Sequence, residues 1–367
     1  MKILVNIARL IVGLTFVLSG SVKAIDPVGT QYKLQDYAEA MGLGGILPDG
    51  MMLAAALLLI TMEVMLGVWT LVGMHRKFTS RLLWLVMLVM TGLTVWIYAK
   101  DPVQDCGCFG DAIVLTNGQT LLKNIVLMAL VTLMAWRPMM MPRLIWRKAQ
   151  WIITFLVLGA IVAVAGWALY RLPLIDFRPY HIGADIKKSM EMPKGAKGPE
   201  YETTFIMEKN GDQKEFTLDD YPDSTWTFVD SKSKIVKEGY VPPIHDFAIQ
   251  RIEDGEDITD EVLSHKGRTI LIVAPHLEKA DIAYFGELNE LYDRAKAHQI
   301  PFYMLTASNE EAIGKWKDET GAEYPFCQMD DITLKTMIRQ SPGIIVLKDG
   351  RIEGKHPARE AKTIVTQ

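Results

Sequence analysis

Residues 51–72 read MMLAAALLLITMEVMLGVWTLV, and Glu63 is the single charged residue among them. A helix crosses the hydrocarbon of a bilayer with about 20 mostly apolar residues, because its backbone must satisfy its own hydrogen bonds there. This stretch therefore predicts a membrane-spanning helix. Four further apolar stretches lie at 3–22, 82–99, 120–136 and 151–170. The sequence predicts a membrane all-α helical bundle of about five spans, and at least four.

The composition changes after Tyr170. The hydrophobic content of 50% and the net charge of −4 average over two unlike halves. Beyond this residue charged side chains recur every few positions, as in a water-soluble domain. We therefore expect a transmembrane helical domain at 1–172, a linker with a small β-hairpin at 173–240, and a soluble α/β domain at 241–367. No basic stripe indicates a nucleic-acid partner, so the lipid bilayer is the partner that the composition predicts.

The charged loops predict the orientation, because Lys and Arg stay on the cytoplasmic side. The loops after the second and fourth spans are basic, whereas those after the first and third are acidic or mixed. The N-terminus is therefore expected in the cytoplasm, and the first span is expected to be retained, since it lacks a small-x-small cleavage site. An odd number of spans places the soluble domain outside, which in a bacterium means an inner-membrane protein with a periplasmic domain. All three cysteines lie on that oxidising side, where disulfide chemistry is available.

Residues 105–111 read DCGCFGD and lie in the outer loop after the third span. A disulfide between Cys106 and Cys108 would close a small, strained ring, and Gly107 would relieve the backbone crowding in it. Strained disulfides exchange more easily than relaxed ones. The pair therefore predicts thiol exchange, with Cys106 and Cys108 as the catalytic residues. A static clip of the loop stays an alternative, and so does a metal site, although no nearby histidine completes one.

Glu63 lies about halfway along the second span. An unpaired carboxylate is costly in hydrocarbon, so Glu63 should be paired, protonated or in a polar cavity. Arg9 in the first span is the expected partner. Together they suggest a proton or quinone site between helices, while a purely structural contact between two helices explains the same residues.

The membrane half resembles two families of membrane proteins. The run from Cys106 to Gly110 is similar to the CxCFG loop of MauE-type methylamine utilisation proteins, and the pattern continues at Asn117, Leu121, Leu122 and Asn124. The first two spans resemble the related DoxX proteins at Arg9, Gly13, Ser19, Gly20, Lys23, Asp26, Pro27, Glu63 and Gly67. These resemblances imply a redox-associated role in which exported client proteins form mixed disulfides with the chain. They also imply a link to quinones, and no other cofactor is indicated.

The second half first predicts strands and then an α/β layer. A hairpin is expected at 201–207 and 214–218 around the Asn210-Gly211 turn, followed by a strand pair at 225–230 and 234–240. From Val241 onward strands alternate with helices, which is typical of an α/β domain. The expected strands are 269–274, 302–306, 343–347 and 351–354, and the expected helices are 279–297 and 310–319.

This order resembles the thioredoxin-like domains of thiol-disulfide reductases and peroxiredoxins. The matching residues are Pro242 to Phe247, Asp254-Gly255, His265 to Arg268 and Ser341-Pro342-Gly343. The resemblance implies that Pro342 is a cis-proline that receives substrate backbone, because proline lacks an N–H. Where active members carry their cysteines, residues 274–279 read APHLEK. The domain therefore has no CxxC pair to cycle.

Two residues of the soluble domain stay candidates. Cys327 is either a small buried hydrophobic residue or a thiol that forms a mixed disulfide with Cys106, Cys108 or a client. His276 either lies beside a helix start as a polar neighbour, or acidifies a thiol and binds substrate. The sequence thus supports a periplasm-facing thiol-redox protein, with a non-catalytic assembly or binding protein as the alternative. It leaves the client and the oligomeric state open.

Overall fold

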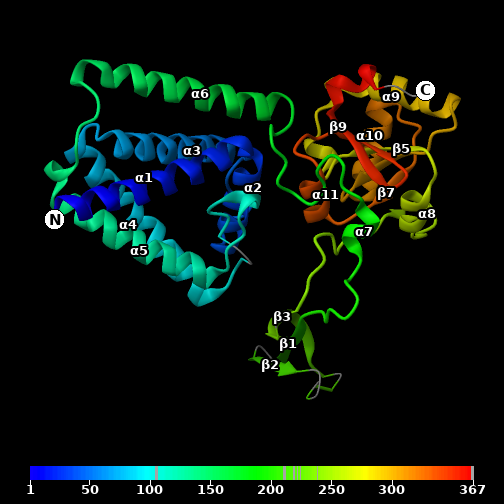
Figure 1. Ribbon diagram of the computed structural model, residues 1–367. Helices are drawn as coiled ribbons and strands as arrows, with labels where there is room; N and C mark the ends of the chain where they lie inside the picture. Colours follow the sequence, from blue (N-terminus) through cyan, green and yellow to red (C-terminus); the bar gives the residue numbers. More distant parts are fainter. Residues whose placement is uncertain are drawn as a thin grey trace.

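The computed structural model describes residues 1–103, 106–209, 212–217, 220, 222–223, 225–237 and 239–364. Figure 1 shows a bundle of long helices beside an α/β domain, with a small sheet at the end of two extended connections. Helix α6 runs along one side of the bundle and leads into the α/β domain.

Among the described residues, five helices are long and apolar enough to span a membrane, as the sequence predicted. They are α1 (Lys2–Ile25), α3 (Asp49–Val72), α4 (Arg76–Lys100), α5 (Asn117–Trp136) and α6 (Gln150–Tyr170), the last preceded by the turn η3 (Arg147–Ala149). Between 17% and 39% of each helix is buried, so most of its apolar surface faces outward, where hydrocarbon would solvate it. The two basic loops lie together, because Arg76 donates hydrogen bonds to the carbonyls of Met139 and Met141.

Helices α1 and α3 pack closely through glycines. A Cβ at Gly13 would lie 2.6 Å from the Leu71 side chain, and one at Gly67 would lie 2.7 Å from the Val17 backbone nitrogen. Small residues allow this close approach in membranes, where packing rather than the hydrophobic effect holds helices together.

A short helix in the first outer loop, α2 (Pro27–Ala40), was not predicted. Asp26 caps it by accepting from the Gly29 N–H, and proline occupies its first position, where a missing N–H has no cost. Helix α2 packs on the outer end of α3, where Gln31 and Gln35 donate to Asp49. The first turns of α3 therefore extend outward past the end of α1 and pack against α2.

The soluble domain is built on a six-stranded sheet of order β4-β7-β6-β5-β8-β9. Strands β5 and β6 and strands β6 and β7 pair in parallel, whereas the neighbouring pairs at both edges are antiparallel. The strands are β4 (Gln250–Arg251), β5 (Arg268–Val273), β6 (Phe302–Thr306), β7 (Phe326–Gln328), β8 (Gly343–Lys348) and β9 (Arg351–Pro357). Separate apolar cores lie on the two faces. The predicted α/β, thioredoxin-like fold class is confirmed.

The helices of this half are α7 (Ile186–Met190), α8 (Thr259–Ser264), α9 (Phe285–Ala297), α10 (Glu310–Thr320) and α11 (Asp331–Met337). Further short turns are η1 (Gly110–Ala112), η2 (Pro138–Met140), η4 (Leu277–Lys279), η5 (Ile282–Tyr284) and η6 (Ala358–Thr363). The helix expected from residue 279 begins only at Phe285, because the Asp281 N–H bonds to the Ser341 carbonyl and its side chain accepts from Ala283.

The small sheet has the order β2-β1-β3, with β1 (Glu200–Lys209), β2 (Asp212–Thr217) and β3 (Thr227–Lys237). The first hairpin matches the prediction, although its Asn210-Gly211 turn lies outside the described residues. The second strand pair was wrong: β3 is one continuous strand, because it pairs with β1 from one end to the other, with two shifts of register. Part of the expected linker also joins the main core, where Tyr180, Ala184 and Ile186 are buried.

Candidate redox site at the CGCFG loop

The two cysteines of the loop between α4 and α5 lie side by side under apolar cover. Their Sγ atoms are 3.1 Å apart, and both residues are buried. Gly107 between them has φ +59°, a left-handed conformation that favours glycine. Tyr37 of α2 donates to the Cys106 carbonyl and packs with Phe109 around the thiols. Gln104 and Asp105, which precede the motif, lie outside the described residues.

The pKa values of the two thiols are shifted in opposite directions. The hydrogen bond with Cys106 and the charges of Lys123 and Lys23 lower the pKa of Cys108 to about 6, although burial opposes this shift. The pKa of Cys106 is raised, first by the same hydrogen bond and then by burial. Lys123 also lies 4.6 Å from the centre of the Phe109 ring. Because the thiolate is the form that attacks and leaves in exchange, Cys108 is the sulfur prepared for that chemistry.

Beneath the loop lies a buried polar cluster of Ser19, Lys23 and Glu63. The Lys23 ammonium is 2.8 Å from both Glu63 carboxylate oxygens and 2.9 Å from Ser19 Oγ. Ser19 Oγ in turn lies 2.6 Å from the Cys108 carbonyl oxygen. The cluster therefore joins α1, α3 and the cysteine loop.

The expected pairing of Glu63 with Arg9 was wrong. Arg9 donates instead to the Leu71 carbonyl near the other end of α3. Because α3 extends outward past α1, the middle of α3 lies level with the outer end of α1, where Lys23 is located. The sequence placed Glu63 by its position along its own helix and so assigned it to the wrong depth.

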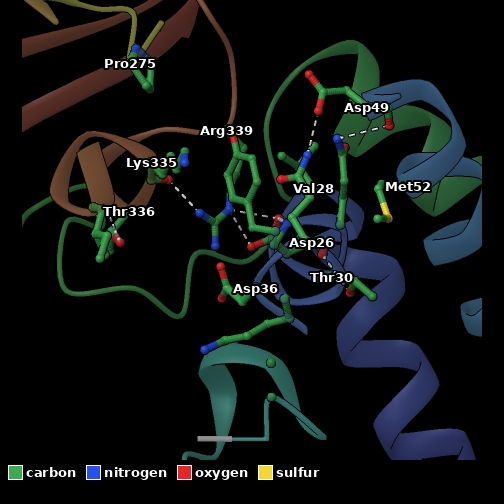
Figure 2. Close-up of a pocket in the computed structure, with 18 of the residues that line it drawn as sticks. Asp26, Val28, Thr30, Asp36, Asp49, Met52, Pro275, Lys335, Thr336 and Arg339 are labelled. Carbon is green, nitrogen blue, oxygen red and sulfur yellow. Dashed lines mark hydrogen bonds and ion pairs between the residues drawn. The ribbon is translucent and has the colours of Figure 1, made fainter. Parts of the chain in front are cut away.

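The soluble domain contacts the end of the bundle at which the cysteine loop lies. Arg339, which follows α11, forms ion pairs with Asp26 at 2.8 Å and with Asp111 at 3.0 Å. Figure 2 shows Arg339 directed from the soluble domain towards Asp26 at the start of α2. Asp111 is three residues beyond Cys108, so the bridge reaches the cysteine loop itself. Gln340 adds a hydrogen bond to the Leu169 carbonyl at the end of α6.

A cavity of about 1210 Å³ lies between the two halves. Gly107 and Lys33 line it from the membrane half, and Pro275, His276 and Ser341 line it from the soluble domain. Gly107 thus exposes the cysteine loop to this cavity, although the two sulfurs themselves are buried behind it. Residues 274–279 are therefore turned, through Pro275 and His276, towards the loop that holds Cys106 and Cys108.

The two predicted substrate-binding residues lie in or next to the lining of this cavity. The Ser341–Pro342 peptide, which lies at the family's cis-proline position, is cis, a point that the sequence left open, and Pro342 directly precedes β8. His276 Nε2 lies 3.1 Å from an Asp331 carboxylate oxygen. The structure thus places His276 in the cavity lining with Gly107, and Pro342 directly follows Ser341 of the same lining.

Cys327 does not join the other thiols. It lies in β7, is 0% exposed, and packs with Ile249 and Met329 in one of the cores. Burial raises its pKa to about 12, so the thiolate is scarce at neutral pH. Strands β6 and β5 lie between β7 and β8, which Pro342 directly precedes, so two strands separate Cys327 from Pro342. The structure supports the reading of Cys327 as a small core residue.

Several residues of the site were not identified as such from the sequence: Ser19, Lys23, Tyr37, Asp111, Lys123 and Arg339. Lys123 offered a signal, because a lysine inside an apolar span is rare and marks a polar environment. Arg339 offered none, since its two partners are more than 200 residues away. Within the part of the chain that the structure describes, no group of three or more His, Cys, Asp or Glu is placed to hold a metal ion.

Two family models match parts of the chain. Residues 1–137 match the family model of the methylamine utilisation protein MauE. The membrane half is therefore MauE-like, and the resemblance to DoxX proteins stays a prediction. Residues 201–238, which contain the small sheet, match a domain of unknown function, DUF8463.

Two solved structures are similar to part of the chain. StoA from Bacillus subtilis is 19% identical, with a TM-score of 0.26, over 32% of this chain and 93% of StoA. A candidate protein disulfide isomerase from Bacteroides thetaiotaomicron is 15% identical, with a TM-score of 0.24, over 31% of this chain and 75% of its own. No curated protein is significantly similar to the chain.

Proposed function

We propose that this MauE-like protein exchanges disulfides with exported client proteins through Cys106 and Cys108, on the periplasmic side of a bacterial inner membrane. The observation that carries the proposal is the cysteine pair itself. The two sulfurs lie 3.1 Å apart in a buried site, and the hydrogen bond with Cys106 and the charges of Lys123 and Lys23 lower the pKa of Cys108 to about 6.

The exchange follows from the unequal protonation of the pair. In the oxidising direction a client thiolate attacks Cys106 of the loop disulfide, the Cys106–Cys108 bond breaks, and Cys108 leaves as the thiolate. A second client thiolate then attacks the client sulfur of the mixed disulfide and releases Cys106. Two electrons pass from the client to the loop, and the two client protons pass to the released sulfurs or to water. The thiol with the lower pKa leaves faster, which favours Cys108 in the first step.

The soluble domain serves recognition in this proposal, because residues 274–279 contain no cysteine. A client segment would occupy the cavity between the halves, with His276 and Pro342 on one side and Gly107 on the other. Since the sulfurs lie behind Gly107, a small movement of the loop would bring them to the client.

A quinone could restore the loop disulfide by accepting two electrons and two protons. The residues expected to hold it do not form one site, because Glu63 is bound by Lys23 and Ser19 while Arg9 bonds to Leu71. They do not fit a common quinone site, and no step is assigned to one.

A second candidate function is a non-catalytic assembly or binding protein. The missing cysteines of the soluble domain favour it, since a recognition face without chemistry is what such a protein needs. In that case Cys106 and Cys108 would form a static clip.

Alkylation with a mass tag separates the two. Membranes containing the protein are equilibrated at a series of redox potentials and the free thiols are counted. Exchange predicts that Cys106 and Cys108 change together from disulfide to dithiol within the physiological range, and that a Cys327→Ser variant behaves in the same way. A pair that stays oxidised or stays reduced at every potential would contradict exchange and favour the static clip.

A further inference from the structure

The cluster of Ser19, Lys23 and Glu63 contains more polar contacts than a contact between two helices requires. Lys23 and Glu63 alone would join α1 to α3, and both side chains are only 6% exposed. A buried ion pair is usually no gain in stability over apolar packing, because both charges lose their water. Its position beside the cysteine loop therefore calls for another explanation.

The proton count connects the cluster to the loop. The three N–H groups of Lys23 are used by the two Glu63 oxygens and by Ser19 Oγ. The single Ser19 proton has two acceptors in reach, the Cys108 carbonyl at 2.6 Å and Glu63 at 2.9 Å. Because Ser19 already accepts from the ammonium, its proton is free to bind the closer Cys108 carbonyl. The ammonium is thus held next to the backbone of one reactive cysteine.

We propose that Ser19, Lys23 and Glu63 are positioning residues that fix the Cys108 backbone and set the charge beside its sulfur, and thereby make the loop disulfide a stronger oxidant of client thiols. The proposal rests on the proposed exchange function and identifies the residues that set the oxidising strength of the same site. A positive charge near Cys108 stabilises the released thiolate, and a disulfide whose reduced form is stabilised is more oxidising. Glu63 holds the ammonium in place and balances part of its charge.

Other groups face the loop from each element packed on it. Lys123 comes from α5, Tyr37 and Lys33 come from α2, and α4 contributes apolar side chains. Asp111, in the loop's own turn, is paired with Arg339. Lys123 is the cation that, together with Lys23 of the cluster, lowers the pKa of Cys108.

The test is the pH profile of Cys108 alkylation by a small reagent, in full-length protein with the Cys327→Ser background. Lys23→Met should move the midpoint upward, because the cation is lost and Glu63 is left beside the loop. Glu63→Gln should move it downward, because the charge of Lys23 is no longer balanced. We expect shifts of about one pH unit, or about tenfold in thiolate fraction below the midpoint. Ser19→Ala should move the midpoint upward by less, since the ammonium stays.

Two further variants keep the result interpretable. Arg9→Gln removes a buried charge from the same helix but far from the loop, and should leave the profile unchanged. If Lys23→Met fails to fold because Glu63 is left unpaired, the double variant with Glu63→Gln removes both charges, and its midpoint should still rise. Shifts of the same sign in Lys23→Met and Glu63→Gln would indicate loosened packing and overturn the proposal, as would no shift in the variants lacking Lys23.

This measurement uses no client, so it is independent of the exchange function. Opposite shifts combined with a pair that never changes its redox state would uphold the charge effect on Cys108 and refute the exchange. Equal redox midpoints for wild type and Lys23→Met, with exchange present, would refute the effect of the cluster on oxidising strength.

Discussion

Replacing Arg339 by methionine should release the soluble domain from the bundle. The Arg339 side chain is 7% exposed, and it contacts Asp26, which is 18% exposed, and Asp111, which is 41% exposed. Removing one partner of a buried charge pair costs about 2–5 kcal/mol. The ion pair with Asp111 is the more exposed of the two, because the Asp111 side chain is in contact with water, and it contributes about 0–1 kcal/mol. We therefore expect about 3 kcal/mol in total, or about a 100-fold weaker docking equilibrium.

Hydrogen exchange on full-length protein in detergent measures this release. Amides of α2 and α11 should exchange faster in Arg339→Met, while those of β5 and β8 should not change, because the soluble core is intact. Lys279→Met is a matched control, since its ion pair with Asp49 at the same interface is exposed on both sides and contributes little. Unchanged exchange in α2 and α11 of a folded Arg339→Met protein would refute the idea that this bridge holds the two halves together.

Three further predictions concern the loop, the soluble core and the topology. Gly107→Ala should weaken disulfide exchange, because φ +59° costs a non-glycine residue about 1–2 kcal/mol and the new Cβ would lie 2.9 Å from the Lys33 side chain. Gly42→Ala is the control: Gly42 has φ +74° but lies in open space, so this variant should keep full disulfide exchange. Burial lowers the pKa of Lys355 from 10.5 to about 8. The unfolded chain then binds more protons between these values, so the unfolding free energy of the soluble domain should rise with pH from about 8 to 10.5. Pulse proteolysis in urea should show this slope in wild type but not in Lys355→Met, and equal slopes would contradict it. Protease added outside spheroplasts should cut the chain after Tyr170, and full protection would overturn the orientation.

The sequence was sufficient for the elements whose pattern is local. The length of the apolar stretches predicted all five spans. Short apolar runs that alternate with helical segments and turns predicted β5, β6, β8 and β9 within a residue or a few of their ends. The sequence missed α2, because that helix is neither long nor strongly apolar and is stabilised by its contact with α3. It also split β3 in two, because the pairing that keeps β3 continuous comes from β1.

The candidate site was predicted in part. Cys106 and Cys108 were found by their spacing, and Glu63 by being a charge in an apolar stretch. Its partner was misassigned because depth along one helix does not determine depth in the bundle when two helices are offset. The sequence left the role of Cys327 open for a related reason: order along the chain does not give the order of strands across a sheet, where β5 and β6 lie between β7 and β8.

Helix α6 lies beyond the residues that match MauE, and its presence decides on which side of the membrane the rest of the chain emerges. Four crossings would return the chain to the side of its N-terminus, away from the cysteine loop. The fifth crossing reverses that parity and lets a domain joined to the end of a MauE-like unit meet the loop from the same compartment. A fusion of this kind needs an odd number of membrane crossings. Deleting α6 while keeping the flanking domains should therefore separate Arg339 from Asp111 by the thickness of the bilayer.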